Sequence, residues 1–207
     1  MVRHRVAGAR WVEMGDETAR VGEEARVGGE AQAGGEAQAG EEAQVSEEAL
    51  LDALNSTPVV DGRAQDLWAD DAAVRRWARA HGGPGDAAAL GWLRTVRDVL
   101  QDATRGPVPQ AALRQVLTGV RRRPEVGAAG LRWRLEAPAE RRLAVELVLA
   151  WYDVQERRPG RLRPCGNDEC RLFLLDRSRA NTARWCSMKT CGNRLKARRH
   201  QERARRT

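Results

Sequence analysis

Large apolar residues are almost absent from residues 22–45 and become frequent only after residue 46. Residues 22–45 read GEEARVGGEAQAGGEAQAGEEAQV, a short repeat of Gly, Glu, Ala and Gln. A segment with so few large apolar side chains cannot form a core. We therefore predict an acidic, disordered leader over residues 1–46 and expect ordered structure to begin near Glu47.

Helical patterns and turn signals alternate after this leader. Residues 49–55, ALLDALN, predict a short apolar helix or strand, and the turn-rich segment NSTPVVDG follows. Asp70 or Asp71 can cap the next helix, which Gly82 and Gly83 would end. This part of the chain thus predicts short elements separated by turns.

Two further helices and a strand follow. Asp86 can cap a helix whose apolar residues keep the i, i+3, i+4, i+7 pattern as far as Gly106. Pro109 suits the first turn of another helix, which we expect to end at Pro124. Residues 131–137, LRWRLEA, then alternate apolar and charged side chains, the pattern of a half-buried strand.

Pro138 opens the last helix of this region, and its apolar residues cover more than one stripe. We expect it to be the central, buried helix. Seven tryptophans carry most of the aromatic area, beside one Tyr and one Phe, and most of them should lie in the core. The pattern predicts a mainly α protein with a small β component: a helical domain over 47–156, a linker over 157–162 and a smaller domain over 163–203.

Four cysteines lie in this smaller domain as C-x4-C, fifteen intervening residues, and C-x4-C: Cys165, Cys170, Cys186 and Cys191. Two close pairs suit a tetrahedral four-thiolate zinc site with Zn–S distances of about 2.3 Å. The spacing favours zinc over free thiols or disulfides in a chain without an export signal, and over an iron–sulfur cluster, which usually has tighter spacing. Four thiolates also close the coordination shell, so we predict one structural zinc ion rather than a catalytic one.

The residues between and after the cysteines predict a treble-clef-like finger. RLFLLD and TARW would form the two strands of a hairpin, and Ser187 would cap a helix with Cys191 in its first turn. Asn193 is a candidate to hydrogen-bond a cysteine sulfur or the backbone of the knuckle. We expect the finger to have only a minor core of its own, and so to need its metal in order to fold. That core would consist of Phe173, Leu174, Leu175, Trp185, Met188 and Leu195.

Positive charge is concentrated in the same region. The chain carries a net charge of +7, yet residues 157–207 hold 16 Lys and Arg against four Asp and Glu, a net charge of +12. A basic helix beside a zinc knuckle suits contact with a phosphate backbone, although a merely solvated helix is the alternative. The candidate nucleic-acid contacts are Arg184, Lys189, Arg194, Lys196, Arg198, Arg199 and Arg203.

Residues 185–200, WCSMKTCGNRLKARRH, with CGNDECRLFLLDRSR before them, resemble the CGNR zinc-finger family. The preceding region, from LLDALNSTPVVDGRAQDL to LRTVRDVL, resembles the helical ABATE-type domain that usually accompanies this finger. The resemblance implies a bacterial, stress-induced transcription regulator that binds nucleic acid, with zinc on the four cysteines. Ala183 departs from the family pattern, in which an arginine often stands there, and the acidic repeat has no counterpart.

Several classes of function compete at this point. No run of about 20 apolar residues or secretory signal is present, so we expect a cytoplasmic protein without a membrane partner. DNA is the favoured partner; RNA or an acidic protein bound by the finger are the alternatives, and the helical domain could hold a small-molecule effector or a protein partner. We expect no enzymatic activity, because no nucleophile with a partnered base, phosphate-binding glycine loop or open metal site stands out.

Overall fold

The computed structural model describes residues 45–128 and 130–205, and within that range the side chains of Arg199, His200 and Glu202 are left out. Residues 1–44 of the predicted leader therefore lie outside the described residues. All described residues belong to one unit, Gln38–Thr207. Among its helices, none is both long and apolar enough to cross a membrane.

The described chain is mainly helical, with short antiparallel strand pairs, as the sequence predicts. Its helices are α1 (Glu47–Leu54), α2 (Asp71–Ala80), α3 (Ala87–Arg105), α4 (Gln110–Leu117), α5 (Arg142–Arg157) and α6 (Asn193–Ala204), with short helical turns η1 (Ala139–Arg141) and η2 (Met188–Gly192). Its strands are β1 (Val59–Val60), β2 (Arg63–Ala64), β3 (Arg121–Gly127), β4 (Gly130–Glu136), β5 (Leu162–Pro164) and β6 (Phe173–Leu175).

The predicted helix starts are confirmed by their caps. Asp70 accepts a hydrogen bond from the Ala72 N–H, and Asp86 accepts one from the Ala89 N–H. Each carboxylate thereby satisfies a backbone donor that has no partner within its helix. Segment 49–55, which the sequence leaves open between helix and strand, lies in α1 and its C-cap.

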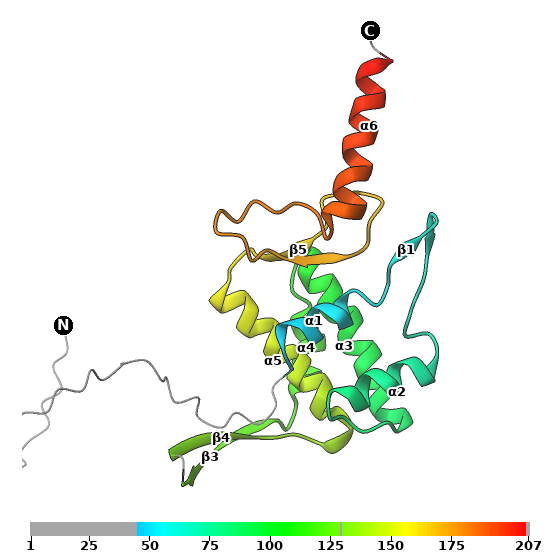
Figure 1. Cartoon of the computed structure of the whole chain (residues 1–207). Helices are drawn as coiled ribbons and strands as arrows, with labels where there is room; N and C mark the ends of the chain where they lie inside the picture. The colour runs from blue at the N-terminus through cyan, green and yellow to red at the C-terminus, as the bar shows by residue number, and fades with distance from the viewer. Residues whose placement is uncertain (1–44, 129, 206–207) are drawn as a thin grey trace, which may run out of the picture. The chain divides into compact units, whose positions relative to one another are not determined.

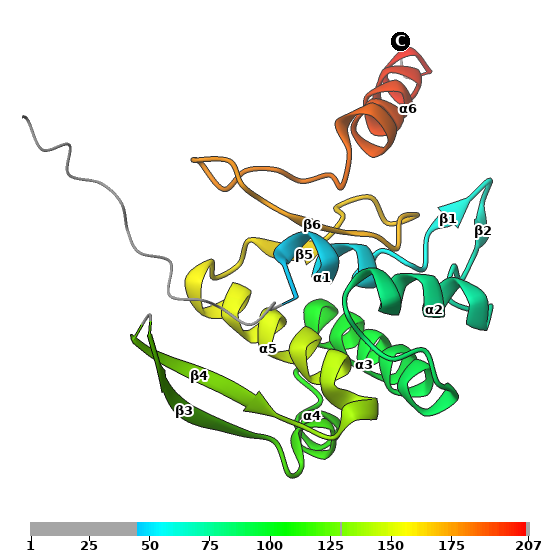
Figure 2. The same cartoon turned by 60° about the horizontal axis from the view of Figure 1, so that its bottom comes forward.

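The hydrophobic core lies between α1, α3 and α5, with α2 against α3 and α4 against both longer helices (Figures 1 and 2). Helix α5 is buried over much of its surface, as predicted. Tryptophan burial is less than expected: among the described tryptophans only Trp68 and Trp151 are buried. Trp rings are so large that they are rarely enclosed on all sides, and several here lie at the edge of the core.

Helix α4 ends earlier than predicted. It stops at Leu117, and Gly119 follows with a φ of 76°, a left-handed conformation that glycine adopts at low cost. Pro124, the expected helix end, instead lies within β3, opposite Trp133 of β4. A proline is tolerated there because a two-stranded hairpin leaves the outer edge of each strand unpaired.

The β3–β4 hairpin is exposed rather than half-buried. The side chains of Leu131, Trp133 and Val126 share one face of the hairpin and are exposed, and Trp133 is 59% exposed. Only Leu135, near the base of the hairpin, packs against the core. The alternating pattern therefore identifies the strand correctly, but the prediction that its apolar face is buried is wrong.

Replacing Trp133 by serine should change the free energy of unfolding by less than about 0.5 kcal/mol, because the ring is largely in water already. Trp151→Ala, which truncates a buried ring, should cost about 3 kcal/mol or more. Urea unfolding of both variants and of the native chain measures the difference. A large loss of stability in the Trp133 variant would show that the hairpin packs in solution.

Strands β5 and β6 attach the cysteine-rich region to the helices. They pair antiparallel, with Leu162 opposite Leu175 and Pro164 opposite Phe173. The hairpin predicted between RLFLLD and TARW is therefore wrong: the partner of β6 precedes the first cysteine, and residues 182–185 form no strand. Strand β6 lies beside α1 and β5 beside α3 (Figure 2).

Candidate metal centre

The four cysteine sulfurs converge on one point. All four sulfurs lie within 4.8 Å of one another, with 3.7 Å between those of Cys170 and Cys186 and 3.6 Å between those of Cys186 and Cys191. A tetrahedral site with Zn–S bonds of about 2.3 Å has edges of about 3.8 Å. The sulfurs are too far apart for disulfides, whose S–S bonds are about 2.05 Å. Their arrangement therefore fits the shell of a tetrahedral metal ion.

The first cysteine pair is held by a tight loop after β5. The Cys170 N–H donates to the carbonyl oxygen of Asn167 at 2.8 Å, which closes the loop. The Gly166 N–H donates to the Arg184 carbonyl oxygen at 2.7 Å, and a Cβ at Gly166 would lie only 3.0 Å from that oxygen. A glycine at this position thus lets the extended segment before the second cysteine pair approach closely.

The second pair is placed by a capped helical turn, as predicted. The Ser187 hydroxyl accepts a hydrogen bond from the Thr190 N–H at 3.4 Å. Cys191 lies in η2 and is buried, and α6 begins directly after this turn. The position of Cys191 therefore fixes the point from which α6 extends.

Asn167, not Asn193, provides the side-chain hydrogen bond to a cysteine. Its Nδ2 lies 3.6 Å from the sulfur of Cys191, and only 2% of the residue is exposed. Asn193 instead donates to the carbonyl oxygen of Lys189. Asn167 is one of the four residues between Cys165 and Cys170, and the Cx4C pattern does not specify these residues. The spacing alone therefore could not identify its role.

Burial raises the pKa of two of these thiols, whereas in Cys191 it is outweighed by hydrogen bonds, that from Asn167 first, which lower the pKa. Burial raises the pKa of Cys170 to about 11 and raises the pKa of Cys186 as well, because thiolates are poorly solvated there and face one another. A divalent cation reverses that preference by stabilising thiolates directly. Four cysteines would complete its tetrahedral shell, and no coordination position would remain for a reactive water. This donor set suits a structural ion.

A family model described as CGNR zinc finger matches residues 161–204. This segment of the chain is therefore similar to CGNR zinc fingers. No curated protein matches the chain. The four cysteines of the CGNR finger are consistent with the single structural zinc ion predicted from the sequence.

The basic residues predicted to contact nucleic acid fall into two groups. Arg184, with its guanidinium 5.3 Å from the Trp185 ring centre, lies beside the cysteine site, and Arg198 pairs with Glu169 at 2.7 Å. The second group consists of exposed residues on η2 and α6. The side chain of Arg199, which was also predicted, lies outside the described residues. These exposed residues are Lys189, Arg194, Lys196 and Arg203.

Two residues predicted to form the minor core of the finger, Met188 and Phe173, do not lie in such a core. Met188 is 53% exposed, so it does not face the cysteine site as expected. Phe173 is buried in the main hydrophobic core together with Leu162. The finger therefore shares the core of the helices through Leu162 and Phe173, while Leu174 of β6 is buried outside that core.

A buried carboxylate organises the loop between the cysteine pairs, and the sequence analysis missed it. Asp176 accepts hydrogen bonds from the backbone N–H groups of Ser178 and Ala183, each at 2.8 Å, and pairs with Arg163 of β5 at 2.7 Å. Hydrogen bonds from Ser178, Ala183 and Arg163 lower the pKa of Asp176 to about 2, against the opposing effect of burial. An Asp after a strand resembles an ordinary turn residue, so its burial could not be anticipated.

Asp176 should make the loop sensitive to acid. Its pKa in the folded chain lies below the ordinary value of 3.8, so its stabilising effect is complete above about pH 4 and is lost as the pH falls towards 2. Asp176→Asn should therefore lower the melting temperature by a constant amount between pH 5 and 7, and by less below pH 4. Melting curves of both proteins at equal zinc concentration test this, because acid release of zinc affects both. A difference that varies between pH 5 and 7 would contradict the assignment.

Proposed function

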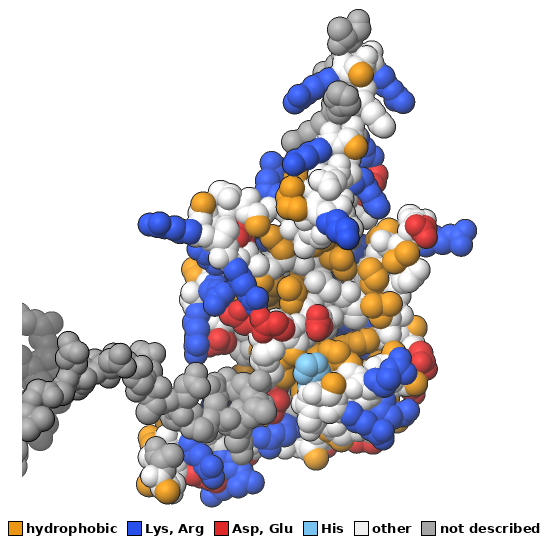
Figure 3. Space-filling view, viewed as in Figure 1, with side chains coloured by type: hydrophobic (Ala, Val, Ile, Leu, Met, Phe, Trp, Pro, Cys, Tyr) orange, Lys and Arg blue, Asp and Glu red, His pale blue; other side chains and the backbone are white. Residues whose placement is uncertain are grey.

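We propose that the chain is a transcription regulator that binds nucleic acid, with DNA favoured, through α6 and the cysteine-rich turn that carries it. The observation that supports this proposal is the setting of α6. The helix extends away from the helical core, and Lys and Arg side chains stand on both of its sides (Figures 1 and 3). Its sequence, NRLKARRHQERA, holds five basic residues and one acidic residue.

The charge of α6 is poorly explained by packing or ion pairing. Arg194 and Lys196 are exposed and make no ion pair among the described residues. Unpaired cations on an isolated helix repel one another, which costs stability unless a partner compensates. Guanidinium groups bind phosphates with two parallel hydrogen bonds, so a phosphate backbone is a suitable partner.

The metal site would give this helix a fixed direction. Cys191 anchors η2 beneath the first turn of α6, and the Arg198–Glu169 pair links the second turn to the loop of the first cysteine pair. An exposed pair of this kind contributes little stability, roughly 0–1 kcal/mol. Its role in the proposal is to orient α6, while Arg194 and Lys196 remain available for phosphates.

The helical part, residues 47–156, would then serve as an ABATE-type sensing or assembly module in a cytoplasmic, non-enzymatic protein. The resemblance of its sequence to that domain supports this role. RNA binding and capture of an acidic protein by the finger are the rival functions. Their outcomes can be distinguished in the binding experiment below.

Arg194→Gln combined with Lys196→Gln should weaken binding to duplex DNA and reduce the salt dependence of binding. Each lost phosphate contact lowers the slope of log K against log salt by about 0.9, so the double variant should lose about 1.8. Fluorescence anisotropy over a salt series measures both quantities. Arg76→Gln combined with Arg79→Gln, two exposed residues of α2, removes the same charge and is the matched control.

Equal losses in the two double variants would mean that net charge, not α6, governs binding. Absence of binding at low salt would overturn the proposal altogether. Tighter binding to a structured RNA of equal length would favour the RNA alternative. A partner recovered with the native chain, but not with the α6 variant, after nuclease treatment would favour the protein alternative.

A further inference from the structure

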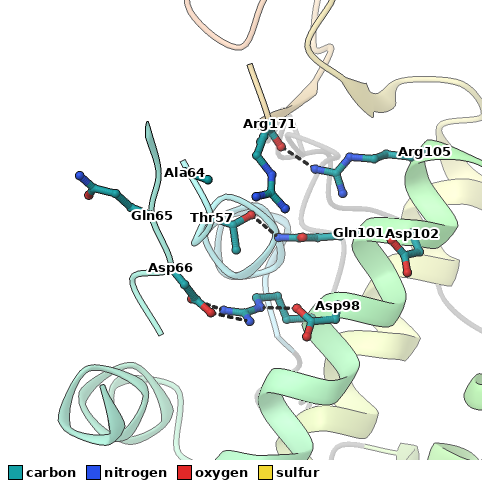
Figure 4. Close-up of a pocket in the computed structure, with 10 residues that line it drawn as sticks. Thr57, Ala64, Gln65, Asp66, Asp98, Gln101, Asp102, Arg105 and Arg171 are labelled. Carbon is teal, nitrogen blue, oxygen red and sulfur yellow. Dashed lines mark hydrogen bonds and ion pairs between the residues drawn. The ribbon is translucent and has the colours of Figure 1, made fainter. Parts of the chain in front are cut away.

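A cavity of about 400 Å³ lies where α3, the segment after β2 and the finger meet (Figure 4). Its size is within the range of small-ligand pockets, roughly 300–1,000 Å³. Arg171 of the finger points down into it, and Arg97, Asp98 and Gln101 line it from α3. The cavity is open to solvent on one side, and it is separate from the cysteine site.

The floor of this cavity is a preorganised, buried polar cluster. Arg97 is only 4% exposed and donates to both carboxylate oxygens of Asp66, at 2.6 and 3.0 Å. Gln101 is equally buried and donates to the carbonyl oxygen of Leu54 and to the hydroxyl of Thr57. Burying charged and amide groups costs free energy unless they are hydrogen-bonded, and these bonds fix the floor.

The end of the cavity beside the finger carries two neighbouring guanidinium groups. Arg105 donates to the carbonyl oxygen of Arg171 at 2.7 Å, and its guanidinium lies 4.3 Å from the ring centre of Phe173. Neither Arg105 nor Arg171 makes an ion pair with any carboxylate of the described chain. Burial and the nearby charge of Arg171 lower the pKa of Arg105, and the carboxylate of Asp102 opposes this shift only in part.

The end beside α2 has the opposite character. Asp66 and Asp98 share the single cation Arg97, with Asp98 accepting from its Nε at 2.9 Å. Negative charge is therefore in excess here, whereas Asp102, one turn further along α3, acts on Arg105 at the other end. The cavity thus has a cationic end at Arg105 and Arg171 and an anionic end at Asp66 and Asp98 (Figure 4).

We propose that this cavity binds a small zwitterion of amino-acid size, with its carboxylate between Arg105 and Arg171 and its ammonium group towards Asp98. A ligand with both charges compensates both ends at once. A simple anion would satisfy only the arginines and would leave the excess of carboxylates as it is. The volume is too small for a peptide or a nucleotide chain to enter fully.

Such a ligand would couple the helices to the finger. Arg171 directly follows Cys170, and Arg105 belongs to the last turn of α3. A carboxylate held by both side chains bridges these two elements and adds to the existing hydrogen bond between them. A bound ligand should therefore strengthen the contact between the finger and α3, and this effect does not depend on whether α6 binds nucleic acid.

Calorimetric titration of the zinc-loaded full chain with pooled L-amino acids tests the proposal, with sodium acetate and methylamine as probes of one charge each. We expect saturable binding of at least one amino acid at concentrations up to about 10 mM, a range that detects millimolar affinities. Arg171→Met and Asp98→Asn should each weaken it about tenfold or more. Arg179→Met, an exposed arginine of the same loop region, should leave it unchanged.

Zinc content and far-UV circular dichroism of each variant establish that it is folded before binding is compared. Absence of saturable binding by every amino-acid pool overturns the proposal. So does equal binding of acetate and amino acids, which would indicate a simple anion site. Unaltered affinity in a folded Arg171→Met variant overturns the assignment of the cavity.

Discussion

Removal of zinc at neutral pH should unfold the region from residue 177 to the end of α6 while leaving α3 and α5 folded. Residues 177–187 contain no helix or strand, so few backbone hydrogen bonds hold them. Their order depends on the cysteine cluster and on hydrogen bonds that Asp176, Arg161 and Arg163 make with the backbone of this segment. Structural zinc sites supply about 10 kcal/mol or more of folding free energy, and loss of that contribution exceeds what Asp176 can offset.

Amide hydrogen exchange before and after chelation measures this expectation region by region. Protection should be lost in η2 and α6 and retained in the core helices, and added zinc should restore it at one ion per chain. Cys191→Ser should reproduce the chelated state in the presence of zinc. Thr190→Ser, the adjacent exposed residue, is the matched control and should behave as the native chain does. Protection of α6 that survives chelation would overturn the structural role of the ion.

The limits of this unfolding follow from the packing of β5 and β6. Leu162 and Phe173 are buried in the main core, so the strand pair that precedes and follows the first cysteine pair has support besides the metal. From the sequence alone, the whole smaller domain, residues 163–203, is expected to need the metal in order to fold. The structure instead predicts a boundary just after Asp176, where β6 has ended and the exposed ion pairs of Arg177 with Glu47 and Glu48 are the contacts with α1.

The metal site could be predicted from the sequence because its signal is local. The spacing of Cys165, Cys170, Cys186 and Cys191 restricts the chemistry, and the Ser187 cap is visible four residues before Cys191. The helix caps at Asp70 and Asp86 are equally local, because each carboxylate meets an N–H two or three residues ahead. Such features need no knowledge of distant segments.

The errors concern contacts between distant segments. Strand β6 pairs with β5, which lies upstream of the first cysteine, because Leu162 and Phe173 both reach the core there. The alternating pattern of β4 reveals a strand but not whether anything covers its apolar face, and Trp133 is exposed. Asn167 and Asp176 acquire their roles only when the loops close around them.

Phe173→Ala should lower the free energy of unfolding of the whole described unit by about 3–5 kcal/mol, the usual cost of truncating a buried aromatic ring. Phe173 is 1% exposed, and its backbone makes two hydrogen bonds with the side chain of Asn55 at the end of α1. The ring also lies beneath the guanidinium of Arg105 from α3. Phe173 of β6 thus contacts the end of α1 through its backbone and Arg105 of α3 through its ring.

Urea unfolding of the zinc-saturated protein, followed by circular dichroism of the helices, tests this coupling. The helical signal should be lost at a lower urea concentration in the Phe173 variant, although the substitution lies outside every helix. Leu131→Ala in the exposed hairpin removes apolar atoms without opening a cavity and should shift the midpoint little.

Zinc affinity provides the second readout, because an independent finger and a shared core predict different results. A finger with its own small core would respond to Phe173→Ala by losing zinc affinity while the helices unfolded at the native midpoint. A shared core requires both properties to fall together, since the ring stabilises the strand that carries the first cysteine pair and the helices beneath it. An unchanged helical midpoint beside weakened zinc binding would therefore refute the shared core.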